Sequence, residues 1–287
     1  MKTAIILGAG ASQPYNFPLG PELKGIVTHF AAEHSAQGFL DQLGYERAHL
    51  QDLTECLRYG RFETIDEFLD AKKSFREIGG YIIAQAILRS ETNSSLFPAR
   101  DWLATLFAKI YKKVLAKEDL NISFITLNYD RTLEYFFSKI TKYDCREDEE
   151  KEVATALSRI PILHPHGSLG SLTELPYGLN GEPSEAIKIQ GAGKRIQIIS
   201  DKLEDSPAYI EAQRELEGVD RILFMGFAYH PSTMGTLLKN IDPEKTELIG
   251  SSFNLSKERA NSVIAWSKST IKLQGVGANS FITDNII

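Results

Sequence analysis

Residues 4–12, Ala-Ile-Ile-Leu-Gly-Ala-Gly-Ala-Ser, decide the fold, because a short apolar run ends there in a glycine loop. Such a run is typical of a strand that is buried on both faces of a sheet. Gly20 and Pro21 follow and suit the first turn of a helix, whose apolar residues recur at helical spacing from Leu23 to Ala31. The chain is therefore predicted to begin with a strand, a glycine loop and a helix.

The rest of the chain continues this alternation of short apolar strands and helices. Residues 36–118 show apolar residues at helical spacing, so we expect them to form a helical module inserted between the first two strands. Strands alternating with helices predict an α/β fold, a doubly wound parallel sheet, in a single domain over residues 1–287. The further strands are predicted at 123–127, 161–163, 196–200, 222–225 and 247–251.

The composition is that of a globular protein, since 43% of the 287 residues are hydrophobic and 24% are charged. A chain of this length buries a sizeable core, which excludes a largely disordered protein. The 32 basic and 38 acidic residues leave a formal net charge of −6. Nucleic-acid binding depends largely on Lys and Arg that neutralise phosphates, so direct nucleic-acid binding is not expected.

The two cysteines, Cys56 and Cys145, are too few for a four-cysteine zinc site or a disulfide framework, and they suit a reducing cytoplasm. No apolar run reaches the ~18 to 20 residues that cross a bilayer. The apolar stretch 4–7 is also shorter than the ~7 to 15 residues of a signal-peptide core. The sequence therefore predicts a cytoplasmic protein that does not span a membrane.

The loop Gly8-Ala9-Gly10-Ala11-Ser12 is the first candidate binding motif. Glycines let the backbone approach a phosphate closely, and the N–H groups at a helix start attract anions. The third glycine of the dinucleotide-binding fingerprint would fall at Gln13, so the match is incomplete. The alternative is that small residues only allow the helix to pack tightly against the strand.

The second motif, Thr126-Leu127-Asn128-Tyr129-Asp130, leaves the end of a predicted strand and enters a helix. Ligands of open parallel sheets bind outside the carboxyl ends of the strands, which places Asn128 and Asp130 where a site is expected. Both residue types are also good helix N-caps, and capping is the favoured interpretation for Asp130 alone.

The third motif, His164-Pro165-His166-Gly167, ends another predicted strand, where a histidine can act as a base near neutral pH. The alternatives are a structural histidine bonded to backbone and a metal site. We do not favour a metal, because no convincing third and fourth ligands accompany the two histidines. A fourth exit, at Gly226, indicates only a close backbone turn.

In this order the motifs resemble those of the sirtuin-like NAD-consuming family, with the nearer match to its bacterial anti-phage defence branch. Residues 65–69, Ile-Asp-Glu-Phe-Leu, also look like a helical motif that recurs in that branch, and the resemblance spans most of the chain. The motifs that carry it are Gly8-Ala9-Gly10-Ala11-Ser12, Thr126-Leu127-Asn128-Tyr129-Asp130, His166-Gly167 and Met225-Gly226-Phe227.

The resemblance implies a Rossmann-like, sirtuin-like domain that hydrolyses the nicotinamide–ribose bond of NAD+, with NAD+ as substrate and no metal. It implies catalytic roles for Asn128 and His166, supported by Asp130. It also implies control by assembly into a homo-oligomer, or by a separate defence partner or trigger protein. The residues that it assigns to NAD+ binding are Gly8, Ala9, Gly10, Ser12, Thr126 and Gly226.

Three departures from the sirtuin pattern count against protein deacylation. Two cysteines cannot build the four-cysteine zinc module of deacylating sirtuins, and Leu127 stands where those enzymes usually have glutamine. Residues 16–20, Asn-Phe-Pro-Leu-Gly, replace a segment that brings an arginine near the pyrophosphate. Three functions remain open: an NAD+ glycohydrolase, a non-catalytic module that senses NAD or ADP-ribose, and a protein deacylase or ADP-ribosyltransferase.

Overall fold

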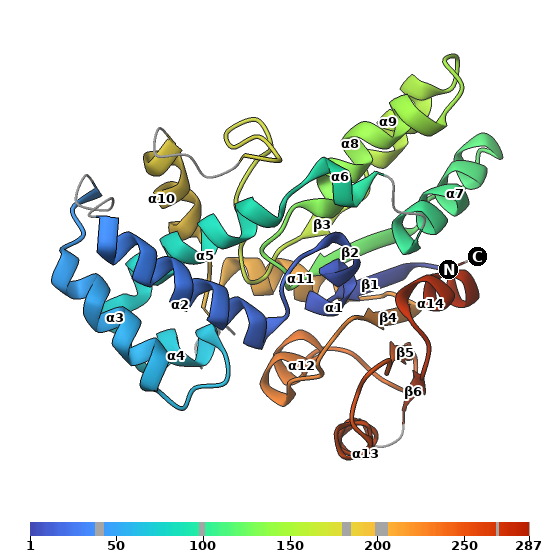
Figure 1. Ribbon diagram of the computed structural model, residues 1–287. Helices are drawn as coiled ribbons and strands as arrows, with labels where there is room; N and C mark the ends of the chain where they lie inside the picture. The colour runs from blue at the N-terminus through green and yellow to red at the C-terminus, as the bar shows by residue number, and fades with distance from the viewer. Residues whose placement is uncertain (38–42, 98–100, 180–184, 199–205, 268–269, 287) are drawn as a thin grey trace.

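The structure, a computed structural model, has one sheet of six parallel strands in the order β3-β2-β1-β4-β5-β6 (Figure 1). It describes residues 1–37, 43–97, 101–179, 185–198, 206–267 and 270–286. The strands are β1 (Thr3–Leu7), β2 (Ile122–Thr126), β3 (Ile162–Leu163), β4 (Arg221–Met225), β5 (Glu247–Ser251) and β6 (Ile271–Gln274).

Both faces of the sheet are buried. Successive side chains along a strand point to opposite faces, so alternate residues of one strand join different clusters. In β1, Ile5 and Leu7 join one apolar cluster while Ala4 and Ile6 join the other. Helices cover both faces, which confirms the predicted α/β fold with a doubly wound parallel sheet. The first face packs against α7 (Trp102–Leu115), α8 (Thr132–Asp144) and α14 (Ala278–Asn285), and the second against α11 (Pro207–Leu216), α12 (Pro231–Leu237) and α13 (Lys257–Trp266).

The strand order reverses direction at β1, which pairs with β2 on one side and with β4 on the other. Leu7 at the end of β1 lies opposite Thr126 of β2 and Met225 of β4, so the three strands end level with one another. This is the strand order of Rossmann folds, whose ligands bind at the point of reversal, outside the carboxyl ends of the strands. The fold therefore draws attention to the segments that follow these three strands.

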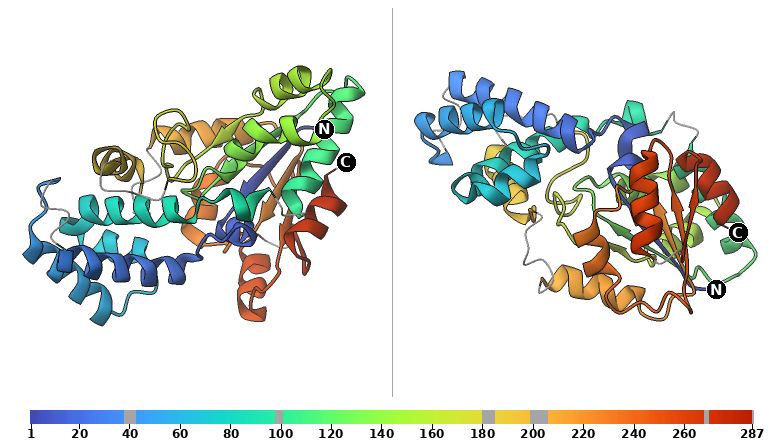
Figure 2. Two further views of the ribbon diagram at one scale, coloured as in Figure 1. Left: turned by 45° about the horizontal axis from the view of Figure 1, so that its top comes forward. Right: turned by 90° about the horizontal axis from the view of Figure 1, so that it is seen from below.

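Beside the sheet lies a helical lobe, which Figure 2 shows extending to one side of the strands. Four of its helices come from between β1 and β2, whereas α10 comes from between β3 and β4 and packs against α5. Close approach of Gly80 and Gly193 makes this helix pair possible, since a Cβ on Gly80 would lie 2.6 Å from the Gly193 carbonyl oxygen. The lobe consists of α2 (Gly20–Gln37), α3 (Arg47–Tyr59), α4 (Ile65–Ala71), α5 (Arg76–Ser90) and α10 (Ala186–Arg195).

The range 36–118, predicted as an inserted helical module, begins within α2 and ends just after α7. Helix α7 packs against α14 beside the sheet, so the lobe and the inserted range overlap without coinciding. The remaining short helices are α1 (Ala9–Ser12), α6 (Asn93–Leu96) and α9 (Glu150–Leu157), with 3-10 turns η1 (Gln13–Tyr15) and η3 (Lys73–Phe75). Within the described ranges, no helix has both the length and the apolar character needed to cross a bilayer.

The strand predicted at 196–200 is not formed over residues 196–198, and residues 199–200 lie outside the described ranges. Helix α10 ends at Arg195, whose carbonyl lies against Gly167, and the Gln197 amide donates to the His166 carbonyl (2.8 Å). The chain thus crosses the end of β3 without joining the sheet. The sixth strand is β6, which the apolar pattern missed because this edge strand has an exposed Lys272 and no continuous apolar run.

Candidate functional site at the carboxyl ends of β1, β2 and β4

The glycine loop after β1 packs backbone to backbone against the exit of β4. The Gly8 amide donates to the Met225 carbonyl (3.0 Å) and the Gly10 amide to the Gly226 carbonyl (3.0 Å). A Cβ on Gly8 would lie 2.5 Å from the Gly226 oxygen, and Gly226 has φ +61° with Ala11 directly behind its Cα. Tight packing therefore accounts for these glycines, and three of the loop amides already donate within the protein, since the Ala11 amide donates to the Gly8 carbonyl (2.9 Å).

Asn128 links the exit of β2 to this loop. Its Nδ2 donates to the Gly8 carbonyl (3.1 Å) and to the Ser12 hydroxyl (3.0 Å), while its backbone amide donates to the Thr126 hydroxyl (3.2 Å). Its side-chain oxygen, Oδ1, makes no hydrogen bond to any described residue. The half-buried amide is thus fixed through its nitrogen, and its oxygen is an acceptor that no described residue uses, at the carboxyl end of the inner strand β2.

Asp130 is buried beside the same serine. Its carboxylate accepts from the backbone amide of Thr132 (3.1 Å), the first residue of α8, but the N-cap position of this helix is Arg131, so Asp130 is not the predicted N-cap. Burial raises the pKa of Asp130, and hydrogen bonds from Thr132 and from the Ser12 side chain oppose that rise. Ser12 thus accepts a hydrogen bond from Asn128 and lies near enough to Asp130 to lower its pKa, which brings together three of the residues predicted to form the site.

His166 lies in the segment that follows β3, and its ring contacts helix α11. Its Nε2 is 2.6 Å from the hydroxyl of Tyr209 on α11, and only 4% of the residue is exposed. Burial lowers the pKa of His166 to about 4, opposed by a hydrogen bond to the backbone of Leu127. At neutral pH the ring is uncharged. Its Gly167 neighbour has φ +75° and lies against the Arg195 carbonyl, where a side chain would collide.

His164, two residues earlier, has polar partners of another kind. Its Nδ1 is 3.0 Å from the backbone carbonyl of Asn128, and its Nε2 is 2.6 Å from Oε1 of Glu134 on α8. Only 11% of the His164 side chain is exposed. In the described part of the chain, no group of three His, Cys, Asp or Glu side chains is arranged to hold a metal ion.

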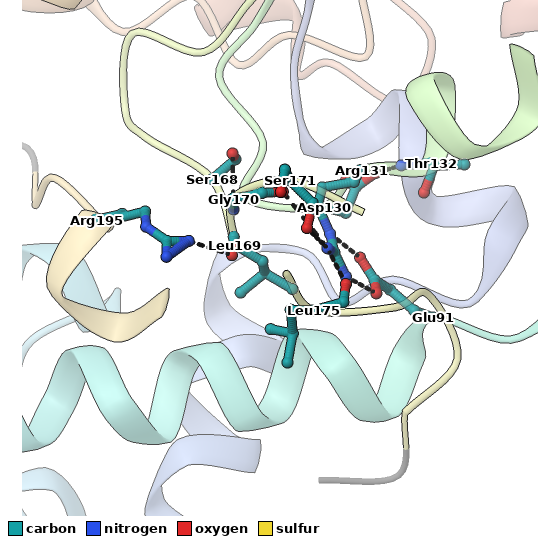
Figure 3. A network of polar contacts seen from close by, with 10 residues as sticks. All are labelled: Glu91, Asp130, Arg131, Thr132, Ser168, Leu169, Gly170, Ser171, Leu175 and Arg195. Atoms are coloured by element: carbon teal, nitrogen blue, oxygen red, sulfur yellow. Dashed lines mark hydrogen bonds and ion pairs between the residues drawn. The ribbon is translucent and has the colours of Figure 1, made fainter. Parts of the chain in front are cut away.

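A buried ion pair supports the segment that follows His166 and Gly167 (Figure 3). Arg131 binds Glu91 in a bidentate manner, with Nε 3.1 Å from Oε1 and Nη2 2.6 Å from Oε2, and both side chains are almost fully buried. Arg131 also donates through Nη1 to the carbonyls of Gly170, Ser171 and Leu175. One guanidinium thus ties the end of α5 and the β2 exit to the loop after β3.

The helical lobe contacts the site through Tyr129. The Tyr129 hydroxyl donates to Oδ1 of Asp66 (2.6 Å), which lies in α4 within the helical motif noted at 65–69. Burial and the adjacent Asp66 raise the pKa of Tyr129 well above its usual value, so the tyrosine remains a hydrogen-bond donor. The lobe therefore fixes the residue that lies between Asn128 and Asp130.

The supporting residues that the sequence analysis did not assign are Glu91, Arg131, Glu134, His164 and Tyr209. Arg131 follows Asp130, and His164 stands two residues before His166. A charged or titratable side chain within a site motif is a sequence signal from which both residues could have been predicted. Glu91 and Tyr209 stand in helical contexts far from any motif. Only the fold reveals their contacts.

A comparison with models of known protein families and a search of curated proteins both give no match. The fold defines the class of protein, an α/β protein with Rossmann strand order, and the site lies where that class binds its ligands. The similarity to the sirtuin-like family remains a prediction from the motifs.

Proposed function

We propose that this protein is an NAD+ hydrolase that cleaves the nicotinamide–ribose bond, giving nicotinamide, ADP-ribose and a proton from NAD+ and water. The observation that carries the proposal is Asn128, whose amide nitrogen is anchored to Gly8 and Ser12 while its oxygen has no hydrogen-bond partner among the described residues at the switch point of the sheet. The Rossmann strand order supports the same location for a dinucleotide.

The leaving group of this reaction needs no proton from the protein. The nicotinamide ring nitrogen is cationic in NAD+, so nicotinamide departs as a neutral molecule without a general acid. The site has to stabilise an oxocarbenium-like ribose and orient the attacking water. The Asn128 oxygen accepts a hydrogen bond from that water or from a ribose hydroxyl, and its orientation is set before the substrate arrives.

In this proposal His166 takes a proton from the water or from a ribose hydroxyl. Its lowered pKa keeps the ring neutral at pH 7, which is the form that accepts a proton. The hydroxyl of Tyr209 lies against Nε2, so the proton reaches the ring through that hydroxyl or after it is displaced. Asp130 supports the site by holding Ser12, and the glycine loop with Ala9, Thr126 and Gly226 shapes the edge along which the dinucleotide lies.

The test is nicotinamide release from NAD+ by purified protein, measured over a range of protein concentrations. Asn128→Ala is expected to lower turnover at least ~10²-fold, because it removes a positioned dipole at the reacting carbon. His166→Ala is expected to lower turnover by roughly 10² to 10⁴. The matched control is Asn121→Ala, since exposed Asn121 lies at the opposite end of β2. Wild-type turnover in both folded site variants would refute these roles.

A second candidate is a non-catalytic module that senses NAD or ADP-ribose. The burial of His166 against Tyr209 favours it, because a ring already bound to a neighbour is less available as a base. NAD+ or ADP-ribose binding by calorimetry, without nicotinamide release at any protein concentration, would support the sensor. Release of an acyl group from a peptide would instead support the deacylase, which the missing cysteine set makes the weakest candidate.

The wider setting is also proposed from the resemblance alone. An NAD+ hydrolase of a bacterial defence system would deplete NAD+ in the cytoplasm after a trigger, with homo-oligomer assembly or a separate partner protein as the switch. Turnover that rises faster than in proportion to protein concentration would support assembly. Turnover strictly proportional to concentration would favour a separate trigger.

A further inference from the structure

His164 is clamped between a carboxylate and a backbone carbonyl next to the site. Nδ1 lies 3.0 Å from the Asn128 carbonyl oxygen and Nε2 lies 2.6 Å from Glu134 Oε1. The ring therefore joins α8 to the peptide that carries Asn128. Neither the motif comparison nor the proposed reaction gives this histidine a role.

The hydrogen-bonding partners fix the protonation of the ring. A carbonyl oxygen only accepts, so Nδ1 carries a hydrogen, and an ionised carboxylate only accepts, so Nε2 carries one as well. The second oxygen of Glu134, Oε2, is buried and has no hydrogen-bond partner in the described chain, so the His164 N–H is the donor that stabilises this carboxylate. The geometry therefore describes an imidazolium paired with a carboxylate.

The surrounding charges agree with this assignment. Burial alone lowers the pKa of His164, but the charge and hydrogen bond of Glu134 outweigh it. The Asn128 carbonyl and the charge of Asp130 act in the same direction, so the pKa lies above its usual value. The titratable groups that face the ring are thus Glu134 from α8 and Asp130 from the β2 exit.

We propose that His164 is a positioning residue for Asn128, held by Glu134 and acting through its Nδ1–H hydrogen bond to the Asn128 carbonyl. The Asn128 amide is meanwhile held by the Thr126 hydroxyl, so both sides of this residue's backbone are fixed. A fixed backbone aims the side-chain amide at Gly8 and Ser12 and leaves Oδ1 at the sheet edge. His164 does not contact the substrate. The kinetic consequence, though not the hydrogen bond, rests on the proposed function.

The kinetic test separates the donor from the bulk of the ring. In His164→Asn the amide NH₂ replaces the Nδ1–H donor, whereas His164→Leu removes it. We expect His164→Leu to lower kcat by roughly 10- to 100-fold with little change in KM for NAD+, because misplaced groups lose orientation more than binding. His164→Asn is expected to recover most of that loss. His29→Leu, on an exposed histidine of α2, is the control.

A spectroscopic test stands apart from activity. In protein with ¹⁵N-labelled histidine and asparagine, the His164 ring at pH 7 should show both nitrogens protonated in the wild type. Glu134→Gln should lower the pH at which that signal titrates, and should move the Asn128 side-chain amide resonances, whereas His29→Leu should not. Because Glu134→Gln keeps the ring and the side-chain volume, it remains informative if His164→Leu fails to fold.

The outcomes distinguish the two proposals. If wild-type protein releases no nicotinamide, the hydrolase fails while the spectroscopic test still decides the role of His164. A deprotonated Nδ1, or Asn128 amide resonances that do not move in Glu134→Gln, overturns the positioning role. Equal loss of kcat in His164→Asn and His164→Leu also overturns it, because the donor would then be irrelevant.

Discussion

The segments on the two sides of β1 are held together by different kinds of contact. On the β4 side, Gly8 and Gly10 meet Gly226 through backbone atoms, with no room for side chains between them. On the β2 and β3 side, charged side chains hold the segments together, through the buried pair of Glu91 with Arg131 and the partly buried pair of Glu134 with His164. Glycines reveal themselves in a sequence, whereas a charge pair between distant segments does not.

The two kinds of contact respond differently to substitution. A backbone contact fails through collision or strain, because an added side chain has nowhere to go. A buried charge pair fails when one partner is removed, because the other charge is left uncompensated away from water. The comparison can therefore be tested by substitutions that act on one side at a time.

Glu91→Gln is expected to have the largest effect. It leaves the fully buried Arg131 without a counter-charge, which should lower the free energy of unfolding by about 3–5 kcal/mol in urea denaturation. The control is Glu152→Gln, since Glu152 pairs with Lys117 where both side chains are about half exposed or more, and less than about 1 kcal/mol is expected there. Equal losses in the two variants would show that burial does not set the strength of these pairs.

Gly226→Ala breaks the other side. A methyl group would collide with Ala11, and φ +61° is a conformation that alanine adopts at a cost. Overpacking and left-handed strain together should lower the free energy of unfolding by about 2–4 kcal/mol. Gly235→Ala in α12 has open space around its Cβ and should be neutral or slightly stabilising. A stable Gly226→Ala protein would mean that the exits of β1 and β4 are not tightly packed.

The lowered pKa of His166 should make the protein less stable at acidic pH. The raised pKa of His164 should act in the opposite direction. The folded pKa is about 4 and the ordinary value is 6.5, so between these values only the unfolded chain binds the proton. Stability is therefore lost as pH falls from 6.5 to 4, by about 2 kcal/mol at pH 5.

The measurement is urea denaturation of wild type and His166→Gln at pH 7.5 and pH 5. The wild type should lose more stability than His166→Gln across this interval, because the variant has no ring to protonate in the unfolded chain. The control is His29→Gln at an exposed site, because it shows how much stability is lost between the two pH values through groups other than His166. Parallel pH profiles for wild type and His166→Gln would contradict a buried neutral ring.

The strands that the sequence located best are those with continuous apolar runs. β1 and β4 are buried on both faces and contain such runs of Ile, Leu, Phe and Met, and β2 has the same apolar residues interrupted by Ser123. The edge strand β6 has polar residues on its exposed side and was missed. The run at 196–198 is apolar in places but packs over the end of β3, so hydrophobicity alone gave the wrong element there.

The sequence also located the candidate site more completely than its supports. Ser12, Asn128 and Asp130 were predicted from motifs, and the structure brings them together, with a hydrogen bond from Asn128 to Ser12. His166 was chosen for the same reason, yet its ring is buried against Tyr209, a partner 43 residues away. Local pattern identifies which residues leave the strand ends, but it does not identify what those side chains will meet.

By itself the sequence determined the alternation of strands and helices, and with it the doubly wound parallel sheet whose strand ends converge. Tertiary structure alone decided that the pKa values of His164 and His166, on either side of Pro165, shift in opposite directions, because Glu134 lies against the first ring whereas burial dominates at the second. The physical reason is that strands and helices follow from local hydrophobic periodicity, whereas the pKa of a side chain depends on the burial and the charges that distant parts of the chain bring to it.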